Sequence, residues 1–188
     1  MRLSRKLGGL LAVAMTAVGL TAAAAPASAS TPSPYWQIVT LGGAPGLPFL
    51  CLQGELGGPL GTSVTQQLCG DPRFPTSPNQ EWLPLSLGGD GYKFQNVGTG
   101  RCLEARNGAV NNGGVALWDC SSTESNTRWQ WPTVSGQAAF PGTHPIQSRV
   151  SNSTGFCLDV PGASSSLSLA LQTYRCNGTV AQLFWITR

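Results

Sequence analysis

Charge is scarce in this sequence, because only 10% of its 188 residues are Asp, Glu, Lys or Arg. Three of the eleven basic residues, Arg2, Arg5 and Lys6, lie at the N-terminus, so the rest of the chain has eight basic and eight acidic residues and no net charge. It also has no cluster of Lys and Arg that could follow a phosphate backbone. We therefore expect no nucleic-acid partner.

Histidine is almost missing, which argues against metal binding and catalysis. Zinc sites use closely spaced Cys and His residues, and the chain has a single histidine, His144, and no such pair. It has no Gly-x-Ser-x-Gly nucleophile elbow, and its acidic residues are too scattered to supply the paired carboxylates of a glycosidase. We expect no metal, no cofactor and no enzymatic activity, and we expect His144 to be a surface or turn residue.

Long apolar runs are missing beyond the first 29 residues. Within that stretch, three basic residues precede an apolar run from Leu7 to Leu20, and Ala27-Ser28-Ala29 offers a small-residue cleavage site. This order is typical of a secretory signal peptide, here residues 1–29. The apolar run is shorter than the ~20 residues that a membrane span requires. We expect a secreted, extracellular protein without a membrane span.

Helical periodicity is missing as well. No apolar stripe of useful length repeats every 3.6 residues, and glycine and proline end each run of β-forming residues after a few positions. Short runs of this kind, separated by turn signals, favour an all-β barrel or sandwich. Six cysteines behind a signal peptide indicate three disulfides.

The spacing of the cysteines reveals an internal repeat. The first cysteine of each pair is at 51, 102 and 157, and the second follows 18, 18 and 19 residues later. This repeat selects one of the fifteen pairings that six cysteines allow. It predicts the disulfides Cys51–Cys69, Cys102–Cys120 and Cys157–Cys176.

A period of about fifty residues with β patterning predicts three copies of one supersecondary unit, none of which can bury its apolar face alone. Three such units can close a barrel that has no exposed edges. The repeats span about 35–85, 88–131 and 144–188. Matching positions in them carry Trp82, Trp129 and Phe184, which we expect to lie in the shared core.

Three sequence marks are distributed over the repeats: a Cys-Leu-Asp opening in repeat three, an aromatic residue two positions before the second cysteine in repeats two and three, and a closing Gln-x-Trp that is intact only in repeat one. The closing triplets are Gln80-Glu81-Trp82, Thr127-Arg128-Trp129 and Gln182-Leu183-Phe184. With these marks, the sequence resembles the ricin-type β-trefoil lectin family, which is also classed as a carbohydrate-binding module family. The resemblance covers residues 35–188 as a single domain. It implies an all-β trefoil of twelve strands in three pseudo-symmetric repeats.

The resemblance also implies a sugar site in the third repeat. In this family a carboxylate accepts hydrogen bonds from sugar hydroxyls, an aromatic ring faces the sugar, and amides bracket it; charged acceptors and rigid rings suit these tasks. The closing glutamine steadies the carboxylate, and the family's usual Asn is replaced here by Ala181, so a neighbouring Asn is expected to substitute. Asp159 is the carboxylate, Tyr174 the ring and Gln172 the bracketing amide. Asn177 is the substitute Asn, and Gln182 is the closing glutamine.

The other two repeats match less well. In repeat two, Trp118 and Asn126 are in place, but Glu104 replaces the aspartate, which makes a weaker second site possible. Repeat one has Gln53 in place of the acid and Gln67 in place of the ring, so we interpret it as structural.

The sequence therefore predicts a non-catalytic, lectin-like protein, expected to be a monomer, that recognises a polysaccharide or glycoconjugate mainly through repeat three. The alternative is a trefoil scaffold with decayed sugar sites, which binds a protein partner in the manner of an inhibitor. In that case the Pro- and Gly-rich loops of repeat one, around residues 42–48 and 70–78, would make the contact.

Overall fold

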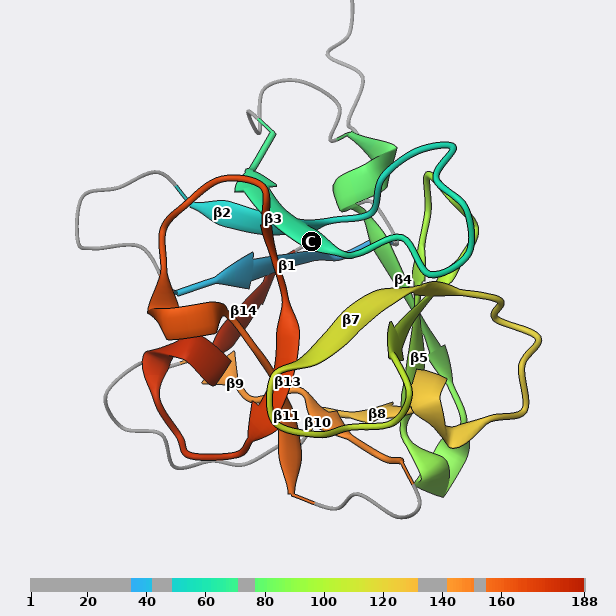
Figure 1. Ribbon diagram of the computed structural model, residues 1–188. Coiled ribbons are helices and arrows are strands. Elements are labelled where there is room, and N and C mark those ends of the chain that lie inside the picture. Colours follow the sequence, from blue (N-terminus) through green and yellow to red (C-terminus); the bar gives the residue numbers. More distant parts are fainter. Residues whose placement is uncertain (1–34, 42–48, 71–76, 132–141, 151–154, 188) are drawn as a thin grey trace, which may run out of the picture. The chain divides into compact units, whose positions relative to one another are not determined.

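A computed structural model describes residues 35–41, 49–70, 77–131, 142–150 and 155–187 (Figure 1). Contacts divide the chain after Thr31, and every described residue lies in the second unit, Pro32–Arg188. The predicted signal peptide and most of the two Pro- and Gly-rich loops of repeat one lie outside the described residues. None of the helices in the described ranges has the length and apolar character that a bilayer crossing requires.

The described residues form fourteen short strands and five 3-10 helices. Repeat one contains β1 (Gln37–Thr40), β2 (Leu50–Gln53), β3 (Thr65–Leu68), η1 (Pro78–Gln80) and β4 (Trp82–Ser86). After η2 (Gly88–Asp90), repeat two contains β5 (Tyr92–Asn96), β6 (Cys102–Ala105), β7 (Gly113–Trp118), η3 (Ser125–Thr127) and β8 (Trp129–Gln130). Repeat three contains β9 (Thr143–His144), β10 (Gln147–Ser148), β11 (Phe156–Asp159), η4 (Pro161–Ala163), β12 (Leu169–Ala170), β13 (Gln172–Arg175), η5 (Val180–Gln182) and β14 (Phe184–Thr187).

The predicted count of twelve strands is wrong, because repeat three breaks its first and third strands in two. Pro145, which has no backbone N–H to give to a ladder, stands between β9 and β10. Leu171 stands between β12 and β13, and its N–H donates to the carbonyl of Val64 in repeat one at 2.9 Å. If each broken pair is counted once, every repeat has the four strands that a trefoil requires.

The first and fourth strands of the repeats close a barrel. Strands β4 and β5 pair, as do β5 and β8, β8 and β10, β9 and β14, and β14 and β1. A bridge between Trp36, just before β1, and Trp82, in β4, completes the ring. Because the ring is closed, none of these strands presents a free edge.

The second and third strands of each repeat form a hairpin, β2–β3, β6–β7 and β11–β13. The three hairpins meet at Val64, Val115 and Leu171, which are all buried. Val64 N–H donates to the carbonyl of Val115 at 3.0 Å, Val115 N–H to Leu171 at 3.3 Å, and Leu171 N–H to Val64 at 2.9 Å. These hydrogen bonds form a closed ring of three, which we call the hairpin ring.

The predicted core residues are fully buried. Trp82, Trp129 and Phe184 each have 0% of their surface exposed. The indole Nε1 of Trp82 donates to the carbonyl of Leu52 at 3.1 Å, and that of Trp129 to the carbonyl of Leu103 at 2.9 Å. The two tryptophans therefore fill the core and also tie the fourth strand of a repeat to its second.

The disulfides confirm the predicted pairing, one per repeat: Cys51–Cys69, Cys102–Cys120 and Cys157–Cys176. No free cysteine remains. Each bond closes a loop of similar length, and in the chain-entropy account a loop of this size stabilises the fold by about 3 kcal/mol.

Candidate functional site

A cavity of about 500 Å³ opens in repeat three. Its lining comes from β11, η4, β13 and the segment around η5; η4 and η5 are the orange and red coils on the left of Figure 1. Among the described residues that line it, Asp159 alone carries a charge. The lining consists of Asn112, Asp159, Pro161, Gly162, Ala163, Gln172, Tyr174, Asn177, Thr179 and Ala181.

Two glutamine amides hold the Asp159 carboxylate. Gln172 lies opposite Asp159 in the β11–β13 register, and its Nε2 donates to Oδ1 at 2.7 Å. Gln182 Nε2 donates to Oδ2 at 3.1 Å from η5. The side chain is 4% exposed, so little of the carboxylate is left for solvent. The structure thus gives Gln182 the contact with Asp159 that the sequence predicts for the closing glutamine.

Burial raises the pKa of the Asp159 carboxyl above its ordinary value of 3.8, and the hydrogen bonds from Gln172 and Gln182 partly oppose that rise. A carboxylate that has lost water gains more from each new hydrogen-bond donor than one in open solvent. The site therefore presents a fixed anionic acceptor, and no cationic side chain is among the described residues that line it.

Tyr174 and Asn177 line the same cavity. Tyr174 is half-buried and lies on the same face of β13 as Gln172, two residues before it. Asn177 is exposed; its Oδ1 accepts hydrogen bonds from Thr179 N at 3.0 Å and Thr179 Oγ1 at 2.8 Å. Four of the five predicted residues thus line one cavity, and the fifth, Gln182, supports it from behind.

Sequence reasoning missed part of this lining. Asn112 comes from the β6–β7 turn of repeat two and reaches the cavity because β7 pairs with β13. Gly162 and Ala163 have φ angles of +63° and +51°, so the η4 turn brings backbone rather than long side chains to the rim. Asn112 could not be predicted as a lining residue, because it reaches the cavity through a contact between two repeats and no motif within one repeat indicates that contact.

The closing glutamine braces the loop around the second cysteine of its repeat. Gln182 Nε2 also donates to the carbonyl of Arg175 at 3.0 Å, and its Oε1 accepts from Asn177 N–H at 2.8 Å. The residues on either side of Cys176 are therefore tied to one amide. Because Gln182 also contacts Asp159, this brace joins the disulfide loop to the cavity.

Gln80 makes the same three contacts in repeat one. Its Nε2 donates to the carbonyl of Leu68 at 2.9 Å and to Oε1 of Gln53 at 3.0 Å, and its Oε1 accepts from Gly70 N–H at 3.0 Å. Gln53 occupies the position of Asp159. Repeats one and three therefore share the brace, and of these two only repeat three adds a charged acceptor to it.

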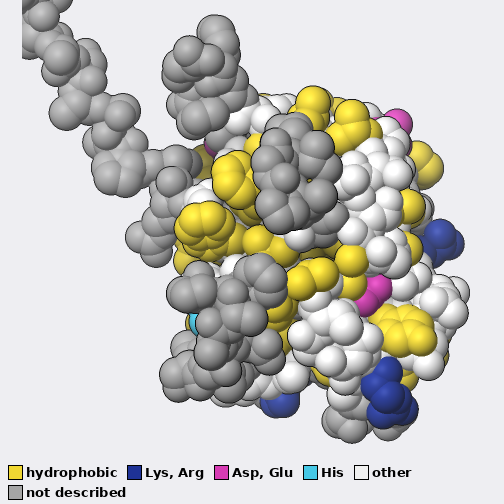
Figure 2. Space-filling view, turned by 90° about the vertical axis from the view of Figure 1, so that its left-hand side faces the viewer, with side chains coloured by type: hydrophobic (Ala, Val, Ile, Leu, Met, Phe, Trp, Pro, Cys, Tyr) yellow, Lys and Arg dark blue, Asp and Glu magenta, His cyan; other side chains and the backbone are white. Residues whose placement is uncertain are grey.

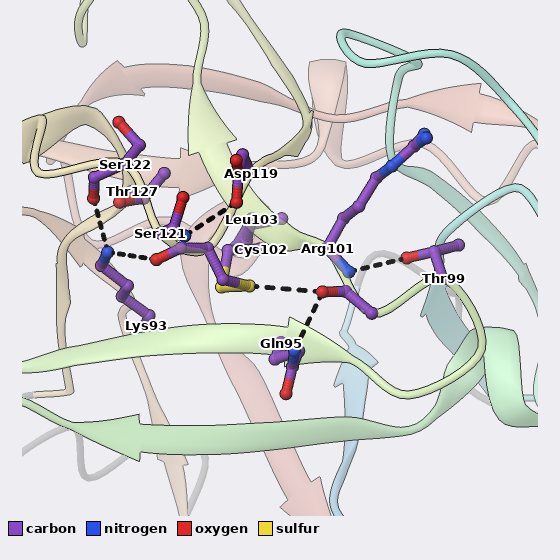
Figure 3. The surroundings of a disulfide bond; sticks show 12 residues. Lys93, Gln95, Thr99, Arg101, Cys102, Leu103, Asp119, Ser121, Ser122 and Thr127 are labelled. Atoms are coloured by element: carbon purple, nitrogen blue, oxygen red, sulfur yellow. Dashed lines mark hydrogen bonds between the residues drawn. A yellow bond between two sulfur atoms is a disulfide. The ribbon is translucent and has the colours of Figure 1, made fainter.

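Repeat two holds the equivalent loop in another way (Figure 3). Thr127, at the glutamine position, is buried and donates to the carbonyl of Glu124. Lys93, from β5, donates instead to the carbonyls of Cys120 and Ser122, both at 2.6 Å. The N–H of Ser121 donates to Asp119 Oδ1 at 2.8 Å, which lowers the pKa of the Asp119 carboxyl. In repeat two, the ammonium group of Lys93 and the Asp119–Ser121 turn thus hold the loop that a glutamine side chain holds in the other two repeats.

The possible second site in repeat two has a buried acid. Glu104 is 6% exposed and lies opposite Ala116, so it lacks the amide that Gln172 gives Asp159. Burial and the nearby Glu124 raise the pKa of Glu104, while Arg106 and a hydrogen bond from Asn126 oppose the rise. Trp118 is half-buried at the position that matches Tyr174. Glu104 and Trp118 thus occupy the positions that Asp159 and Tyr174 have in repeat three, and Asn126 forms a hydrogen bond with Glu104.

Repeat one has no acid at this position. Gln53 lies opposite Thr65, and Gln67, at the position of Tyr174, donates through Nε2 to Ser168 Oγ at 2.9 Å. Neutral groups therefore occupy each position that is charged or aromatic in repeat three.

Replacing Gln182 with methionine is expected to lower the free energy of unfolding by about 1–3 kcal/mol, because the N–H of Asn177 and the carbonyl of Arg175 lose their partner. Gln80→Met should cost a similar amount, since Gln80 makes the same contacts. Chemical denaturation of both variants measures this. A change within about 0.5 kcal/mol for both, the range of ordinary surface substitutions, would contradict the brace.

The structure corrects the expectation for His144. This residue forms β9, is half-buried, and packs its ring against Trp131 at a centroid distance of 5.5 Å. In the described part of the chain, no group of three or more His, Cys, Asp or Glu is placed to hold a metal ion.

The surface on the repeat-three side is mostly uncharged. Figure 2 shows a face on which apolar and neutral polar side chains predominate among the described residues and charged ones are few. A ligand that is itself neutral and polar fits such a face better than a strongly charged one.

The closed barrel, the hairpin ring and one disulfide per repeat define a β-trefoil. The comparisons confirm the predicted resemblance: residues 78–152 match the family described as "Ricin-type beta-trefoil lectin domain-like". This match covers repeat two and stops before Asp159. No curated protein matches the sequence significantly.

Several solved structures share the fold. A designed three-fold symmetric protein, ThreeFoil, superposes with a TM-score of 0.68 at 21% identity over 83% of this chain and 99% of its own. The ricin B-like lectin of Macrolepiota procera, in complex with lactose, gives 0.61 at 12% identity over 82% and 94%. An exo-β-1,3-galactanase from Clostridium thermocellum gives 0.62 at 19% identity over 81% of this chain, which spans only 30% of that enzyme.

The sequence identities to these structures are 21% or less, so the structural similarity establishes the fold alone. A ricin-type lectin fold supports carbohydrate binding as the general activity and suggests a protein that is not itself an enzyme, although glycosidases such as the galactanase carry the same fold as part of a longer chain. The three disulfides are consistent with an extracellular location.

Proposed function

We propose that this chain is a secreted, non-catalytic carbohydrate-binding protein that recognises a polysaccharide or glycoconjugate mainly through the cavity of repeat three. Asp159 accepts hydrogen bonds from two sugar hydroxyls, and the ring of Tyr174 contacts the apolar face of the sugar. Gln172 and Asn177 contribute amide groups, and Gln182 fixes the carboxylate. Glu104, Trp118 and Asn126 form a weaker second site in repeat two.

The observation that carries this proposal is the clamped carboxylate. Asp159 is the only charged group among the described residues of a 500 Å³ cavity, and two amides orient it at 2.7 and 3.1 Å. A catalytic acid pair would need a second carboxylate in the same cavity. Among the described residues the other buried acid is Glu104, which lies in a different repeat.

The expected affinity for one sugar is modest. A shallow site with one carboxylate and one ring binds a monosaccharide near the millimolar range, about −4 kcal/mol. A polymer that reaches a second site gains through effective concentration. The relative from Macrolepiota procera was solved with lactose, which supports a sugar ligand without identifying the one bound here.

A second candidate function is protein binding through repeat one. The described part of repeat one carries four exposed large apolar side chains, Phe49, Leu56, Leu60 and Leu68, and has neither an acid nor a ring at its sugar-site positions. Exposed apolar groups of this kind are common at protein interfaces.

A binding screen of residues 30–188 against polysaccharides and a glycan array tests the proposal. It is run with wild type, Asp159→Ala and Tyr174→Ala, and folding is checked by near-UV circular dichroism. We expect wild type to bind and both variants to lose binding. Gln53→Ala and Gln67→Ala, at the matching positions of repeat one, are the controls and should keep it.

Binding that survives in both Asp159→Ala and Tyr174→Ala would overturn the assignment to repeat three. A wild-type chain that binds no glycan but captures a protein through Phe49 and Leu56 would favour the second candidate.

The affinity for sugar is expected to fall as the pH is lowered. Protonation of Asp159 removes the charged acceptor, and because burial raises its pKa above 3.8, protonation begins at a higher pH than in an ordinary aspartate. Binding should therefore be complete near neutral pH and be lost as the pH falls through the raised pKa. Calorimetric titrations from about pH 7 to about pH 4 measure this.

The contribution of the same carboxyl to stability has the opposite sign. Since the folded state binds this proton more readily than the unfolded state, ionisation of Asp159 costs stability at neutral pH, and protonation restores it. Loss of affinity at low pH is thus not explained by unfolding at this residue. If Asp159→Asn kept the full pH dependence of the affinity, another group would be responsible.

A further inference from the structure

The turn between β6 and β7 of repeat two borders the cavity of repeat three. Strands β7 and β13 lie side by side (Figure 1), and their antiparallel register places Gly113 opposite Thr173. Continued by one residue, the same register places Asn112 beside Tyr174. Both of these residues line the cavity. Repeat two therefore contributes a side chain to the site of repeat three.

Hydrogen bonds hold this turn on β13. Thr173 is fully buried; its Oγ1 donates to the carbonyl of Val110 at 2.8 Å and accepts from the N–H of Val110 at 3.3 Å. The N–H of Arg175 donates to Oδ1 of Asn111 at 3.0 Å. Asn112 follows directly, with a φ of +58° that asparagine adopts more readily than most other residues. Its neighbours therefore fix the place of Asn112 at the rim.

The matching turns of the other repeats show what a side chain at this position can reach. Gly61, Asn112 and Ser168 each stand three residues before the hairpin-ring residue of their repeat, and their φ angles are all positive. Oγ of Ser168 accepts a hydrogen bond at 2.9 Å from Nε2 of Gln67, the residue of repeat one that matches Tyr174. A side chain at the turn position thus reaches the ring position of the neighbouring repeat.

Of these three turn residues, Asn112 alone carries an amide. Gly61 borders repeat two, where its N–H donates to the carbonyl of Leu117 at 2.9 Å, but it has no side chain to offer. Asn112 is exposed, and its amide has one acceptor oxygen and two N–H donors. A sugar hydroxyl both donates and accepts hydrogen bonds, so this uncharged amide complements it.

Asp159 and Asn112 lie on opposite sides of β13. Asp159 ends β11, Asn112 comes just before β7, and β13 runs between these two strands. Neighbouring strands are about 4.8 Å apart, so the two backbones are separated by roughly 10 Å. Asp159 is buried and Asn112 is exposed at the rim. The cavity of about 500 Å³ also has more room than a single monosaccharide fills.

We propose that this cavity takes at least two linked sugar units, the first on Asp159 and the second against Asn112. Asn112 is then a specificity-determining residue that repeat two supplies to repeat three. This inference rests on the proposed function of repeat three. It narrows the ligand class to oligosaccharide or polysaccharide chains whose second unit presents a hydroxyl to the Asn112 amide.

The test compares monosaccharides with disaccharides that begin with the same unit. The four pairs are galactose with lactose, glucose with cellobiose, xylose with xylobiose, and N-acetylglucosamine with diacetylchitobiose. Each is titrated into residues 30–188 and followed by NMR. For a pair that binds, we expect the disaccharide to bind roughly 3- to 10-fold more tightly, the effect of one hydrogen bond. The side-chain amide signals of Asn112 should shift with the disaccharide only.

Asn112→Gly removes the amide and keeps a residue that accepts a positive φ, as Gly61 does at the matching position. We expect this variant to lose the preference for the disaccharide and to bind the monosaccharide as the wild type does. Ser168→Gly is the matched change beside repeat one and should alter neither affinity. Asp159→Ala should abolish binding of both sugars.

The outcomes separate the second-unit contact from the site itself. Equal weakening of both sugars in Asn112→Gly would show that the turn is only structural, and a preference for the disaccharide that survives would show that Asn112 makes no contact with it. Either result, or a wild type without that preference, would overturn the inference while leaving Asp159 in place. Binding that survives Asp159→Ala would overturn the proposed function instead. A wild type that binds none of the eight sugars would overturn both.

Discussion

Replacing Asp159 with asparagine is expected to weaken sugar binding by roughly 10- to 100-fold. Hydrogen bonds to a charged group contribute about 1.5–3 kcal/mol each, and every 1.4 kcal/mol is a factor of ten. Asparagine keeps the size of the side chain but has one acceptor oxygen, so either Gln172 or Gln182 would face a second amide. Two effects on the free energy of unfolding oppose each other, because the substitution removes a desolvated charge but leaves one glutamine amide without its acceptor.

Isothermal titration with the glycan found in the screen measures this effect. Glu104→Gln is the matched change in repeat two, and we expect it to alter the affinity by no more than about threefold, as for one weak contact. The reverse pattern, with Glu104→Gln the more damaging variant, would move the principal site to repeat two.

Trp129→Ala is expected to lower the free energy of unfolding by about 3–5 kcal/mol. The side chain is fully buried, and its removal leaves a cavity and takes the indole donor away from the carbonyl of Leu103. Small domains have about 5–15 kcal/mol in total, so the variant should be close to unfolding.

Urea denaturation of the variant beside Trp185→Ala tests this. Trp185 is 43% exposed and contacts Phe49 at the surface, and its removal should lower the stability clearly less than the removal of Trp129. Equal stability of the two variants would show that Trp129 does not contribute to the core as argued.

The repeat made most of the fold predictable. Cysteine spacing alone selected the disulfides, and the resemblance assigned Asp159, Gln172 and Tyr174 to one site, which now line one cavity. Trp82 and Trp129 followed from the closing triplet. These features depend on residues at fixed spacing within one repeat, which a single sequence displays.

Contacts between repeats and departures from the pattern were not predictable. Lys93 reaches the loop after Cys120 from β5, and Asn112 reaches the cavity of repeat three from repeat two, because the barrel brings distant segments together. His144 was expected at the surface or in a turn, since nothing in its neighbours along the chain reveals Trp131. The broken strands of repeat three result from Pro145 and from the inward turn at Leu171.

The hairpin ring also gives the order of the three repeats a direction. Repeat one donates to repeat two, repeat two to repeat three, and repeat three back to repeat one, always in the same direction. Each unit therefore has a head and a tail in this ring, in which a unit by itself leaves one donor and one acceptor open. Three separate copies of one repeat could satisfy these groups as a cyclic trimer. Covalent linkage turns that assembly into a single chain, and so leaves one unit free to keep a clamped carboxylate while another loses it.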